Sequence, residues 1–551
     1  MSQLTKYIKA HALKNSLEFG KTNPSIIIPK LFQHGLKKEN IKSALSEINK
    51  LVKEINALSK EQKEKQLAPL LSLLPEKKEQ STELPILPNL SNKMIFRAAP
   101  FPSGALHLGH ARTFLLNTMY AEKNKGKILL VIDDTIGSEE KQVLPEAYNL
   151  IKDSFKWLRI NYGNKIILKS DRLEIYYDYA EKLIQKEKAY VCYCPQEKFQ
   201  KLKEQKNNCP CRNKPNQLKN WEKIFSLKPG KAVLRLKTSM QDPNPAFRDR
   251  VLFKISDRPH PLVGTKYSVW PTLEMSWAID DHLLGITHII RGNDLLIETD
   301  VEKYIWDIFN WIHPTVIHHG LIKLEGTMGK ISKSKAQKEI KSGEFVGWED
   351  PRTWSLQSLK QRGILPEAIR EFVKELGMTK QDTTVPIETL YSINRKLIDS
   401  TSNRYSFVKN PVEIEIINPP KIKETKVPIH PDKKAARTIP ISNKIFISKQ
   451  DFEKLKGKEI RLLHLYNIKL LPNNKAEFTS KENKDIPKIN WVSSPNTKCK
   501  ILQPDGNYDN GIAEQAIKTL KKDEVLQFER YAFVKFQKKS QDTYEFWFTH
   551  K

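Results

Sequence analysis

The chain has 551 residues, too many for one hydrophobic core, and its length indicates three to five domains. Lysine and arginine total 93 against 64 for aspartate and glutamate, so the formal net charge is +29. This excess favours a polyanionic partner, although a basic solvated surface would have the same composition. No apolar run reaches the ~18 residues that span a bilayer, and the N-terminus lacks a signal-peptide core, so we expect a cytoplasmic protein without membrane association.

Residues 1–80 have the spacing of amphipathic helices, with apolar residues three and four positions apart in runs such as I-K-S-A-L-S-E-I-N-K-L-V. This pattern predicts a helical N-terminal extension. The serine and prolines of residues 81–93 predict a linker that joins the extension to the rest of the chain.

The stretch 96–112, F-R-A-A-P-F-P-S-G-A-L-H-L-G-H-A-R, predicts a strand, a loop and a helix. Two prolines and Gly104 interrupt the apolar run, and helical spacing without proline follows. His107 and His110 therefore stand at a helix N-terminus, where backbone N–H groups and imidazole donors can bind a polyphosphate. Gly109 would let the backbone approach a flat ligand such as adenine. The alternative is a chance pairing of two histidines at a helix start.

The run K-I-L-L-V-I at 127–132 predicts a second strand, which ends at Asp133 and Asp134. Carboxylates at the carboxyl end of a parallel strand face the crevice where α/β sheets bind ligands. Asp133 is therefore our candidate for binding a substrate ammonium group. Helix capping is the alternative for Asp134 and the favoured role of Thr135.

Four of the five cysteines form two close pairs, Cys192 with Cys194 and Cys209 with Cys211. Disulfides are rare in the cytoplasm, and four thiolates can complete a tetrahedral zinc shell. The one-residue spacing within each pair is tighter than in most zinc sites, and the strand-like A-Y-V-C-Y-C can instead bury its cysteines as small apolar residues. Structural zinc is our expectation.

The apolar run at 286–290 predicts a buried strand that ends at Arg291, so its guanidinium should enter the same crevice as Asp133. A buried arginine needs an anion, which is either a substrate carboxylate or a neighbour such as Asp294. Arg97, in the first predicted strand, is a second candidate for a substrate carboxylate.

Residues 330–335, K-I-S-K-S-K, form a basic segment preceded by two glycines, which suits closure over phosphate. Alone, such a segment is usually a solvated loop. Following the H-L-G-H helix start, it predicts that Lys330, Ser332 and Lys333 bind a nucleotide. Helical spacing continues to about residue 404, and from 405 a period of two predicts β-barrels.

The H-L-G-H and K-I-S-K-S segments resemble the two signatures of class I aminoacyl-tRNA synthetases. The longer P-F-P-S-G-A-L-H-L-G-H resembles the glutamyl/glutaminyl branch, and the β-barrel ending is similar to its archaeal-type glutamyl members, because bacterial glutamyl enzymes end in helices. The likeness covers nearly the whole chain. It implies a multidomain α/β protein with these parts: a helical N-terminal extension at 1–80, a linker at 81–93, a Rossmann-type doubly wound catalytic domain in two halves at 94–190 and 263–340, an acceptor-binding insertion with the candidate zinc site at 191–262, a helical stem-contact region at 341–404, and all-β anticodon-binding barrels at 405–551.

The resemblance also implies an activity, the ligation of glutamate to tRNA(Glu) through a glutamyl-adenylate made from ATP with Mg²⁺. It implies catalytic roles for His107, His110, Lys330 and Lys333, ATP binding by these four with Pro100, Gly104, Gly109 and Ser332, and amino-acid binding by Arg97, Asp133 and Arg291. Glutaminyl enzymes have a neutral residue at the Arg291 position, so Arg291 favours glutamate.

Two alternatives stay open: a glutaminyl enzyme, which Arg291 opposes, and a non-catalytic paralogue, which three departures from the family pattern make conceivable. Val131 and Ile136 replace an arginine and an aspartate, and Leu273 replaces a tyrosine, so that Trp270 or Trp277 would reshape the pocket. The alternatives are a glutaminyl-tRNA synthetase and a non-catalytic tRNA-binding paralogue.

Overall fold

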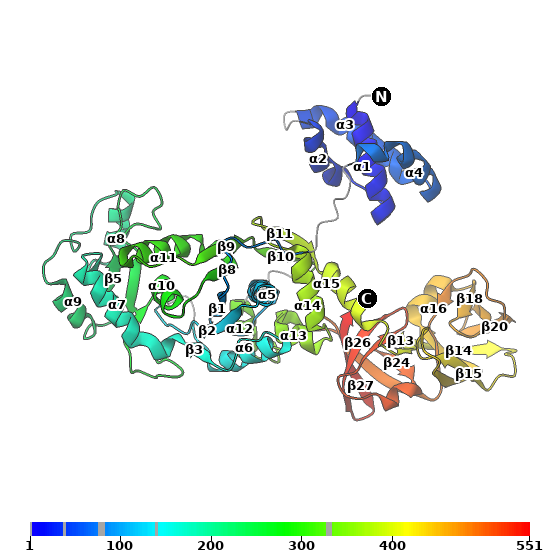
Figure 1. Cartoon of the computed structure of the whole chain (residues 1–551). Coiled ribbons are helices and arrows are strands. Elements are labelled where there is room, and N and C mark those ends of the chain that lie inside the picture. The colour runs from blue at the N-terminus through cyan, green and yellow to red at the C-terminus, as the bar shows by residue number, and fades with distance from the viewer. Residues whose placement is uncertain (1–2, 37–39, 75–82, 138–141, 327–332) are drawn as a thin grey trace. The chain divides into compact units, whose positions relative to one another are not determined.

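The computed structural model describes residues 3–36, 40–74, 83–137, 142–326 and 333–551. The chain divides into two compact units, Met1–Thr82 and Glu83–Lys551 (Figure 1). Within the described ranges, the search for a helix with both the length and the apolar character of a membrane span finds none.

The first unit is helical, as the spacing of its apolar residues predicts. It contains α1 (Gln3–Phe19), α2 (Pro24–Leu31), α3 (Ile41–Ala57) and α4 (Lys60–Leu67). Two helices begin at strong caps: Asn23 accepts a backbone N–H at the start of α2, and Ser59 forms a capping box with Gln62 at the start of α4. The apolar faces of the helices enclose a small core that includes Ile8, Ile27 and Ile48.

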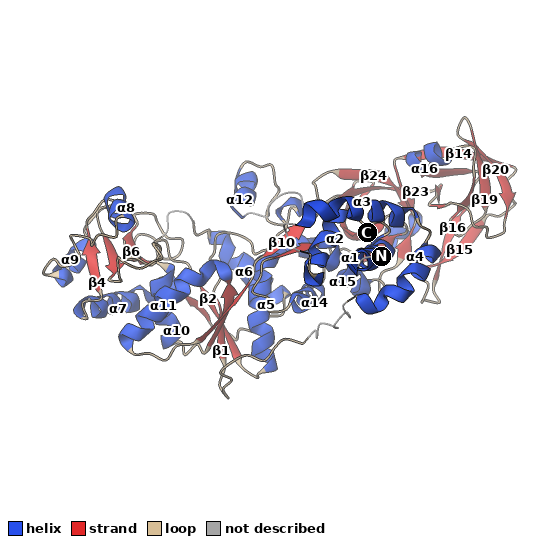
Figure 2. Cartoon of the chain, turned by 90° about the horizontal axis from the view of Figure 1, so that it is seen from above, coloured by secondary structure: helices blue, strands red, loops and turns tan. Residues whose placement is uncertain are grey.

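The second unit begins with a parallel sheet, as predicted for a doubly wound domain. Its order is β1 (Ile95–Ala98), β2 (Lys127–Ile132) and β3 (Ile166–Leu168). The parallel pair β8 (His288–Gly292) and β9 (Thr315–His319) joins it beside β1, where Thr287 N donates to Ile95 O at 2.9 Å. Figure 2 shows α5 (Leu108–Lys123) on one side of these strands, with α10 (Leu273–Leu283) and α11 (Leu296–Phe309) on the other. The Rossmann-type prediction is confirmed.

The insertion is a small antiparallel sheet with two helices. Its strands follow in chain order, β4 (Ala189–Cys192), β5 (Val233–Leu236), β6 (Val251–Ile255) and β7 (Val269–Pro271), with α8 (Gln196–Glu204) and α9 (Gln217–Ile224) between β4 and β5. The helix α7 (Leu173–Gln185) leads into β4, and β7 leads directly into α10. Because Trp221 and Trp270 of the insertion share a core with α10, the insertion fixes one end of that helix.

Helices connect the catalytic part to the barrels. They are α12 (Lys333–Lys341), α13 (Leu356–Gln361), α14 (Pro366–Leu376) and α15 (Ile387–Ile398), while β10 (Ile322–Glu325) pairs with β11 (Thr383–Pro386). Arg362, which follows α13, donates to the carbonyls of Phe548 at 3.1 Å and Thr549 at 3.0 Å. These bonds attach the last strand of the chain to the helical region.

The C-terminal region, yellow to red in Figure 1, contains two seven-stranded sheets, a two-stranded sheet of β15 (Glu424–Pro428) and β16 (Ala436–Pro440), and the helix α16 (Lys449–Leu455). The prediction of barrels is confirmed. One sheet is ordered β12 (Arg404–Tyr405), β25 (Val525–Phe528), β26 (Ala532–Ser540), β27 (Thr543–His550), β23 (Asn496–Leu502), β24 (Tyr508–Glu514) and β13 (Phe407–Lys409). The other is ordered β21 (Lys488–Ile489), β18 (Glu459–Leu462), β19 (Asn467–Leu471), β20 (Lys475–Ser480), β14 (Pro411–Ile417), β17 (Lys444–Ser448) and β22 (Val492–Ser493). Chain segments from both ends of the region enter the first sheet, because β12 and β13 pair with strands formed more than 90 residues later.

Candidate functional site

The start of α5 is built by the two histidines themselves. His107 is the N-cap, and its Nδ1 accepts the Gly109 N–H at 3.1 Å, while His110 Nδ1 accepts the His107 N–H at 3.3 Å. An acceptor at Nδ1 places the ring proton of each neutral imidazole on Nε2. Each ring therefore carries its N–H donor at Nε2, at the positive end of a helix dipole. Phosphate oxygens are acceptors, so such donors suit a phosphate.

Two glycines of the first motif are required by close packing. A Cβ at Gly109 would lie 3.0 Å from Cε1 of His107, so any side chain there would displace the capping ring. Gly104 has φ +129°, and a Cβ there would lie 2.4 Å from the Trp348 ring. The sequence predicts that Gly109 admits an adenine ring, and the contact with His107 is a second reason for glycine at this position.

The second motif lies partly outside the described residues, which do not include Lys330 and Ser332. Lys333 is the first residue of α12. Ala336 of α12 packs with Trp348 and with Ala105, which directly follows Gly104. In addition, His107 forms an isolated β-bridge with Ser355. The Trp348 contacts thus attach the helix that follows the second motif to the loop that carries the first.

Arg97 and Asp281 form a buried pair at the other end of the site. Arg97 lies in β1, and its Nε and Nη2 donate to the two carboxylate oxygens of Asp281 in α10, the second at 2.9 Å. The Arg97 guanidinium carbon also lies 4.3 Å from the ring centroid of Trp277. Pro100, which follows β1, accepts the Asp133 N–H at 3.0 Å and so connects β1 to the end of β2.

Arg291 is paired with a buried carboxylate, and that carboxylate does not belong to Asp294. Its Nη1 and Nη2 donate to the two oxygens of Glu302 in α11 at 3.0 and 2.6 Å, and Nη2 also donates to Thr299 Oγ1 at 2.5 Å. The neighbouring carboxylate of the ion-pair alternative is therefore that of Glu302 and not that of Asp294, and the amino-acid-binding role of Arg291 stays a prediction. Burial raises the pKa of Glu302.

Asp133 also has an internal partner. Its Oδ2 lies 3.3 Å from Lys169 Nζ, and its Oδ1 accepts from Thr135 Oγ1 at 3.0 Å. Lys169 is buried, burial lowers its pKa, and its Nζ lies 5.0 Å from the Trp277 ring centroid. The next carboxylate, Asp134, accepts from Ser170 and Tyr148 and has a structural role.

The three cations therefore converge on one indole ring. Arg97, Lys169 and Arg291 surround Trp277, and each is paired with a carboxylate. We call these seven residues the Trp277 cluster: Arg97, Asp133, Lys169, Trp277, Asp281, Arg291 and Glu302. The cluster brings together all the predicted amino-acid-binding residues.

Sequence reasoning missed Lys169, Asp281 and Glu302. A signal was available for the last, because Glu302 is spaced three and four residues before the apolar Ile305 and Trp306 and so belongs to the buried face of its helix. The departures Val131 and Ile136 are buried apolar residues, and Ile136 belongs to the core that α10 and the insertion share.

A cleft of about 520 Å³ lies beside the cluster, between the catalytic part and the insertion. The catalytic side supplies Asp133, Thr135 and Leu273. The insertion side is basic, and its lining includes Lys203, Arg235, Arg248, Arg250 and Lys254. Of the predicted amino-acid-binding residues, Asp133 lines this cleft, although it is only 1% exposed; Arg97 and Arg291 are also buried and are not among the lining residues.

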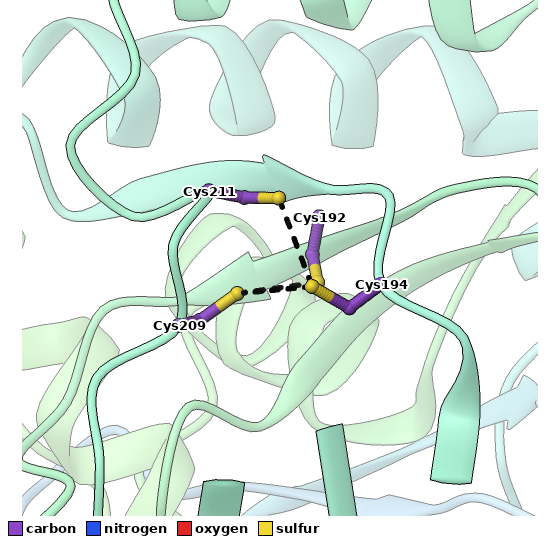
Figure 3. A group of neighbouring side chains, drawn as sticks. All are labelled: Cys192, Cys194, Cys209 and Cys211. Carbon is purple, nitrogen blue, oxygen red and sulfur yellow. Dashed lines mark hydrogen bonds between the residues drawn. The ribbon is translucent and has the colours of Figure 1, made fainter. Parts of the chain in front are cut away.

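The four paired cysteines meet in the insertion. Figure 3 shows their sulfur atoms pointing toward one another, with Sγ–Sγ distances of 3.6 Å for Cys192–Cys209, 3.7 Å for Cys194–Cys209 and 3.9 Å for Cys194–Cys211. Zinc–sulfur bonds of about 2.3 Å in a tetrahedron separate the sulfurs by roughly 3.8 Å. The hydrogen bond with Cys209 lowers the pKa of Cys192 to about 5, whereas burial raises the pKa of Cys194 to about 11. The donor set and its dimensions fit a zinc ion.

The fold and these sites define the chain as a class I tRNA synthetase: it belongs to the family of tRNA synthetases class I (E and Q), whose catalytic domain matches residues 93–400. Two models of the family's anti-codon binding domain match residues 402–487 and 481–537. The glutamate–tRNA ligase of Pyrococcus furiosus is 38% identical over 580 aligned positions that cover 100% of both chains. That of Methanocaldococcus jannaschii is 35% identical, covering 98% of this chain and 99% of its own. Among solved structures, a glutamate-tRNA synthetase from Elizabethkingia anophelis is 21% identical, with a TM-score of 0.41, over 56% of this chain and 70% of its own.

Proposed function

We propose that the chain is a glutamate–tRNA ligase. The observation that carries this function is the full-length similarity to archaeal glutamate–tRNA ligases, which includes the helical N-terminal unit and both barrels. Glutamate's α-carboxylate attacks the α-phosphate of ATP, and glutamyl-adenylate and pyrophosphate form. The terminal ribose hydroxyl of tRNA(Glu) then attacks the glutamyl carbonyl and displaces AMP. Since no covalent enzyme intermediate is needed, the site acts by positioning and charge stabilisation.

At the nucleotide end, His107 and His110 would donate to the phosphates, and Pro100, Gly104 and Gly109 would shape the loop around the adenosine. Lys330, Ser332 and Lys333 would neutralise the charge that grows on the phosphorus and on the leaving pyrophosphate. Support for this assignment comes from the imidazole orientation at the start of α5 and from the Trp348 contacts that join the two motif regions. Mg²⁺ would accompany ATP and offset phosphate charge.

At the amino-acid end, Asp133 would bind the ammonium group of glutamate, and Arg97 and Arg291 its carboxylates. The convergence of Arg97 and Arg291 around Trp277 supports this assignment. Asp133 lines the cleft and is therefore the first of the three that an entering amino acid meets.

For zinc, we propose that Cys192, Cys194, Cys209 and Cys211 hold one ion with a structural role. Metal analysis of the purified chain should find about one zinc per molecule, and Cys209→Ser should abolish it. Cys499→Ser is the control, because Cys499 is buried in β23 of a barrel and should leave the zinc content unchanged.

For tRNA, the basic wall of the cleft would hold the acceptor end, and the barrels would bind the anticodon. A second cleft of about 460 Å³ between the two sheets carries Lys409, Lys488, Arg530 and Tyr531, the residue types on which splayed bases stack and phosphates pair.

The test of the function is aminoacylation of unfractionated tRNA with labelled glutamate and, separately, labelled glutamine, each with and without ATP. ATP-dependent incorporation of glutamate alone is expected. Incorporation of glutamine would indicate the glutaminyl alternative, and incorporation of neither, with no tRNA-dependent pyrophosphate exchange, would indicate a binding paralogue.

A further inference from the structure

A loop between α12 and α13 contacts both nucleotide motif regions, and we call residues 344–355 the Trp348 loop. The Trp348 ring lies only 2.4 Å from the place that a Cβ at Gly104 would occupy, and α12, which follows the second motif, packs in the same small core. Directly after the loop, the chain bonds to the first motif again, because Leu356 N donates to Leu106 O at 2.8 Å. The position of this loop therefore decides where the two motif regions stand relative to each other.

Asp350 and Arg352 hold the Trp348 loop closed. The buried Asp350 carboxylate accepts the backbone N–H of Val346 at 3.2 Å and that of Arg352 at 3.0 Å, so it joins the two sides of the loop. The Arg352 guanidinium binds the same carboxylate, with Nε–Oδ1 at 2.8 Å and Nη2–Oδ2 at 2.7 Å, and its Nη2 also donates to Glu344 O at 2.8 Å. Because a bidentate arginine–carboxylate pair fixes orientation as well as charge, Arg352 fixes the shape of the loop.

The Arg352 side chain also lies against the C-terminal barrel region. Gly506, in the turn between β23 and β24, has φ +87°, and a Cβ there would lie 2.8 Å from Cδ and 2.9 Å from Nε of Arg352. Both the backbone conformation and the lack of space therefore favour glycine at this position. The base of the turn is held by two side-chain bonds, since Gln503 Nε2 donates to Tyr531 OH at 2.9 Å and Tyr531 OH donates to Asp509 Oδ2 at 2.6 Å. The barrel thus limits where the Arg352 guanidinium can stand.

We infer that Arg352 is a positioning residue for the nucleotide site, and that Gly506 of the barrel region holds it in place. The inference rests on the proposed function, which assigns the nucleotide site, and it adds two residues to that site's support. Arg352 acts through Asp350 and the Trp348 loop, and so it fixes the first motif relative to α12. Small displacements of groups that bind the reacting phosphates are costly, so a loosened loop should weaken ATP binding. The Trp277 cluster contains no residue of this loop, so the glutamate end should be unaffected.

The test is Arg352→Ala in the full chain. Isothermal titration calorimetry with ATP and Mg²⁺ measures the Kd of ATP, and tRNA-dependent pyrophosphate exchange measures the KM for glutamate. We expect the Kd of ATP to rise at least fivefold and the KM for glutamate to stay constant. A merely structural Arg352 predicts a different result, a lower urea midpoint with an unchanged Kd of ATP in the folded protein. That result, or a KM for glutamate that rises in parallel with the Kd of ATP, would overturn the inference.

Gly506→Ala tests the barrel side, and it also serves if Arg352→Ala does not fold. The added Cβ displaces the Arg352 side chain, so we expect the Kd of ATP to rise at least threefold. The matched control is Gly457→Ala, because Gly457 also lies in the barrel region and has a similar φ of +79°, but no atom of the described residues lies within 4 Å of its added Cβ. This control carries similar backbone strain and should keep the wild-type Kd. Equal Kd values for Gly506→Ala and Gly457→Ala would overturn the inference.

The double variant Arg352→Ala/Gly506→Ala shows whether the two residues act together. Once the Arg352 side chain is removed, the methyl group added at position 506 no longer meets it, so the double variant should bind ATP as Arg352→Ala does. Additive losses would mean that Gly506 acts by another route and would overturn the inference. Arg404→Ala is the control for Arg352, because Arg404 pairs with Asp399 at 3.3 Å and its side chain is 24% exposed, compared with 29% for Arg352. It should leave the Kd of ATP unchanged.

The ATP affinities separate this inference from the proposed function. If the wild type binds ATP but charges no glutamate, the proposed function has failed, and the Kd values of the variants still support or overturn the role of Arg352. If the wild type charges glutamate and all variants bind ATP equally well, the proposed function stands and the inference is wrong. A wild type that binds no ATP would overturn both.

Discussion

The nucleotide end and the amino-acid end of the candidate site are held together in different ways. At the nucleotide end, the imidazoles of His107 and His110 bond to backbone groups two and three residues away. At the amino-acid end, Arg97 pairs with Asp281, which is 184 residues distant in sequence, and every other charge of the Trp277 cluster also has a partner from another element.

This difference has a physical cause. Phosphate binding at a helix N-terminus needs exposed N–H donors, which a short loop can orient by itself. Buried charges need partners in a medium of low polarity, and only tertiary packing can bring those partners together. Substitutions at the nucleotide end should therefore change mainly the catalytic rate. Substitutions at the amino-acid end should change mainly the free energy of unfolding.

The largest effect is expected from Glu302→Leu. This change leaves Arg291 buried without a carboxylate, and breaking a buried pair costs about 3–5 kcal/mol of unfolding free energy. The double variant Arg291→Met/Glu302→Leu should recover much of that loss. Urea unfolding followed by tryptophan fluorescence measures both.

The control for that prediction is Arg159→Ala, which breaks a pair with Glu367 whose side chains are 73% and 41% exposed. An exposed pair contributes at most about 1 kcal/mol, so the urea midpoint should move little. If Glu302→Leu is as stable as this control, the ion pairs do not stabilise the Trp277 cluster, and the proposed difference between the two ends is wrong.

The next effect concerns catalysis at the nucleotide end. Lys333→Ala should lower the rate of adenylate formation at least tenfold, because it removes a cation from the segment expected to stabilise the transferring phosphoryl group, with little change in glutamate affinity. Pyrophosphate exchange measures the rate. Lys338→Ala, an exposed lysine of the same helix α12, is the control. Equal rates for Lys333→Ala and the wild type would remove Lys333 from the catalytic residues.

Gly109→Ala should have a smaller effect confined to the same end. The added Cβ lies 3.0 Å from the His107 ring, so the ring must shift by a few tenths of an ångström and the cap must weaken. We expect the KM for ATP to rise severalfold at constant glutamate KM, as measured by pyrophosphate exchange. A glutamate KM that rises in parallel would mean that the two ends are coupled.

The smallest effect is a pH dependence at the amino-acid end. Burial, and then the positive charge of Arg291, lower the pKa of His318 from 6.5 to about 4. Between these values the unfolded chain binds the proton and the folded chain does not, so stability is complete above about pH 6.5 and is lost as the pH falls toward 4. His318→Gln should keep more of its stability between pH 7 and pH 5 than the wild type, as measured by urea midpoints; identical losses would exclude a contribution from His318.

Much of the fold could be predicted from the sequence because its signals are local. Helical spacing identified the N-terminal unit, a buried run ending in Asp133 identified β2, and the period of two after residue 405 identified the barrels. The strand order of the sheet that contains β12 and β13 could not be predicted, because these strands pair with strands near the end of the chain, and partners that distant leave no local pattern.

The candidate site divides in the same way. The sequence by itself determined the histidine helix start and the two cysteine pairs, because each depends on residue types at short fixed spacings. Only the tertiary structure decided that Glu302, and not Asp294, neutralises Arg291, that Lys169 faces Asp133, and that Trp277 lies among three cations. The reason is that a buried charge must be compensated, but the partner that compensates it is chosen by which helices the packing of the core places beside it.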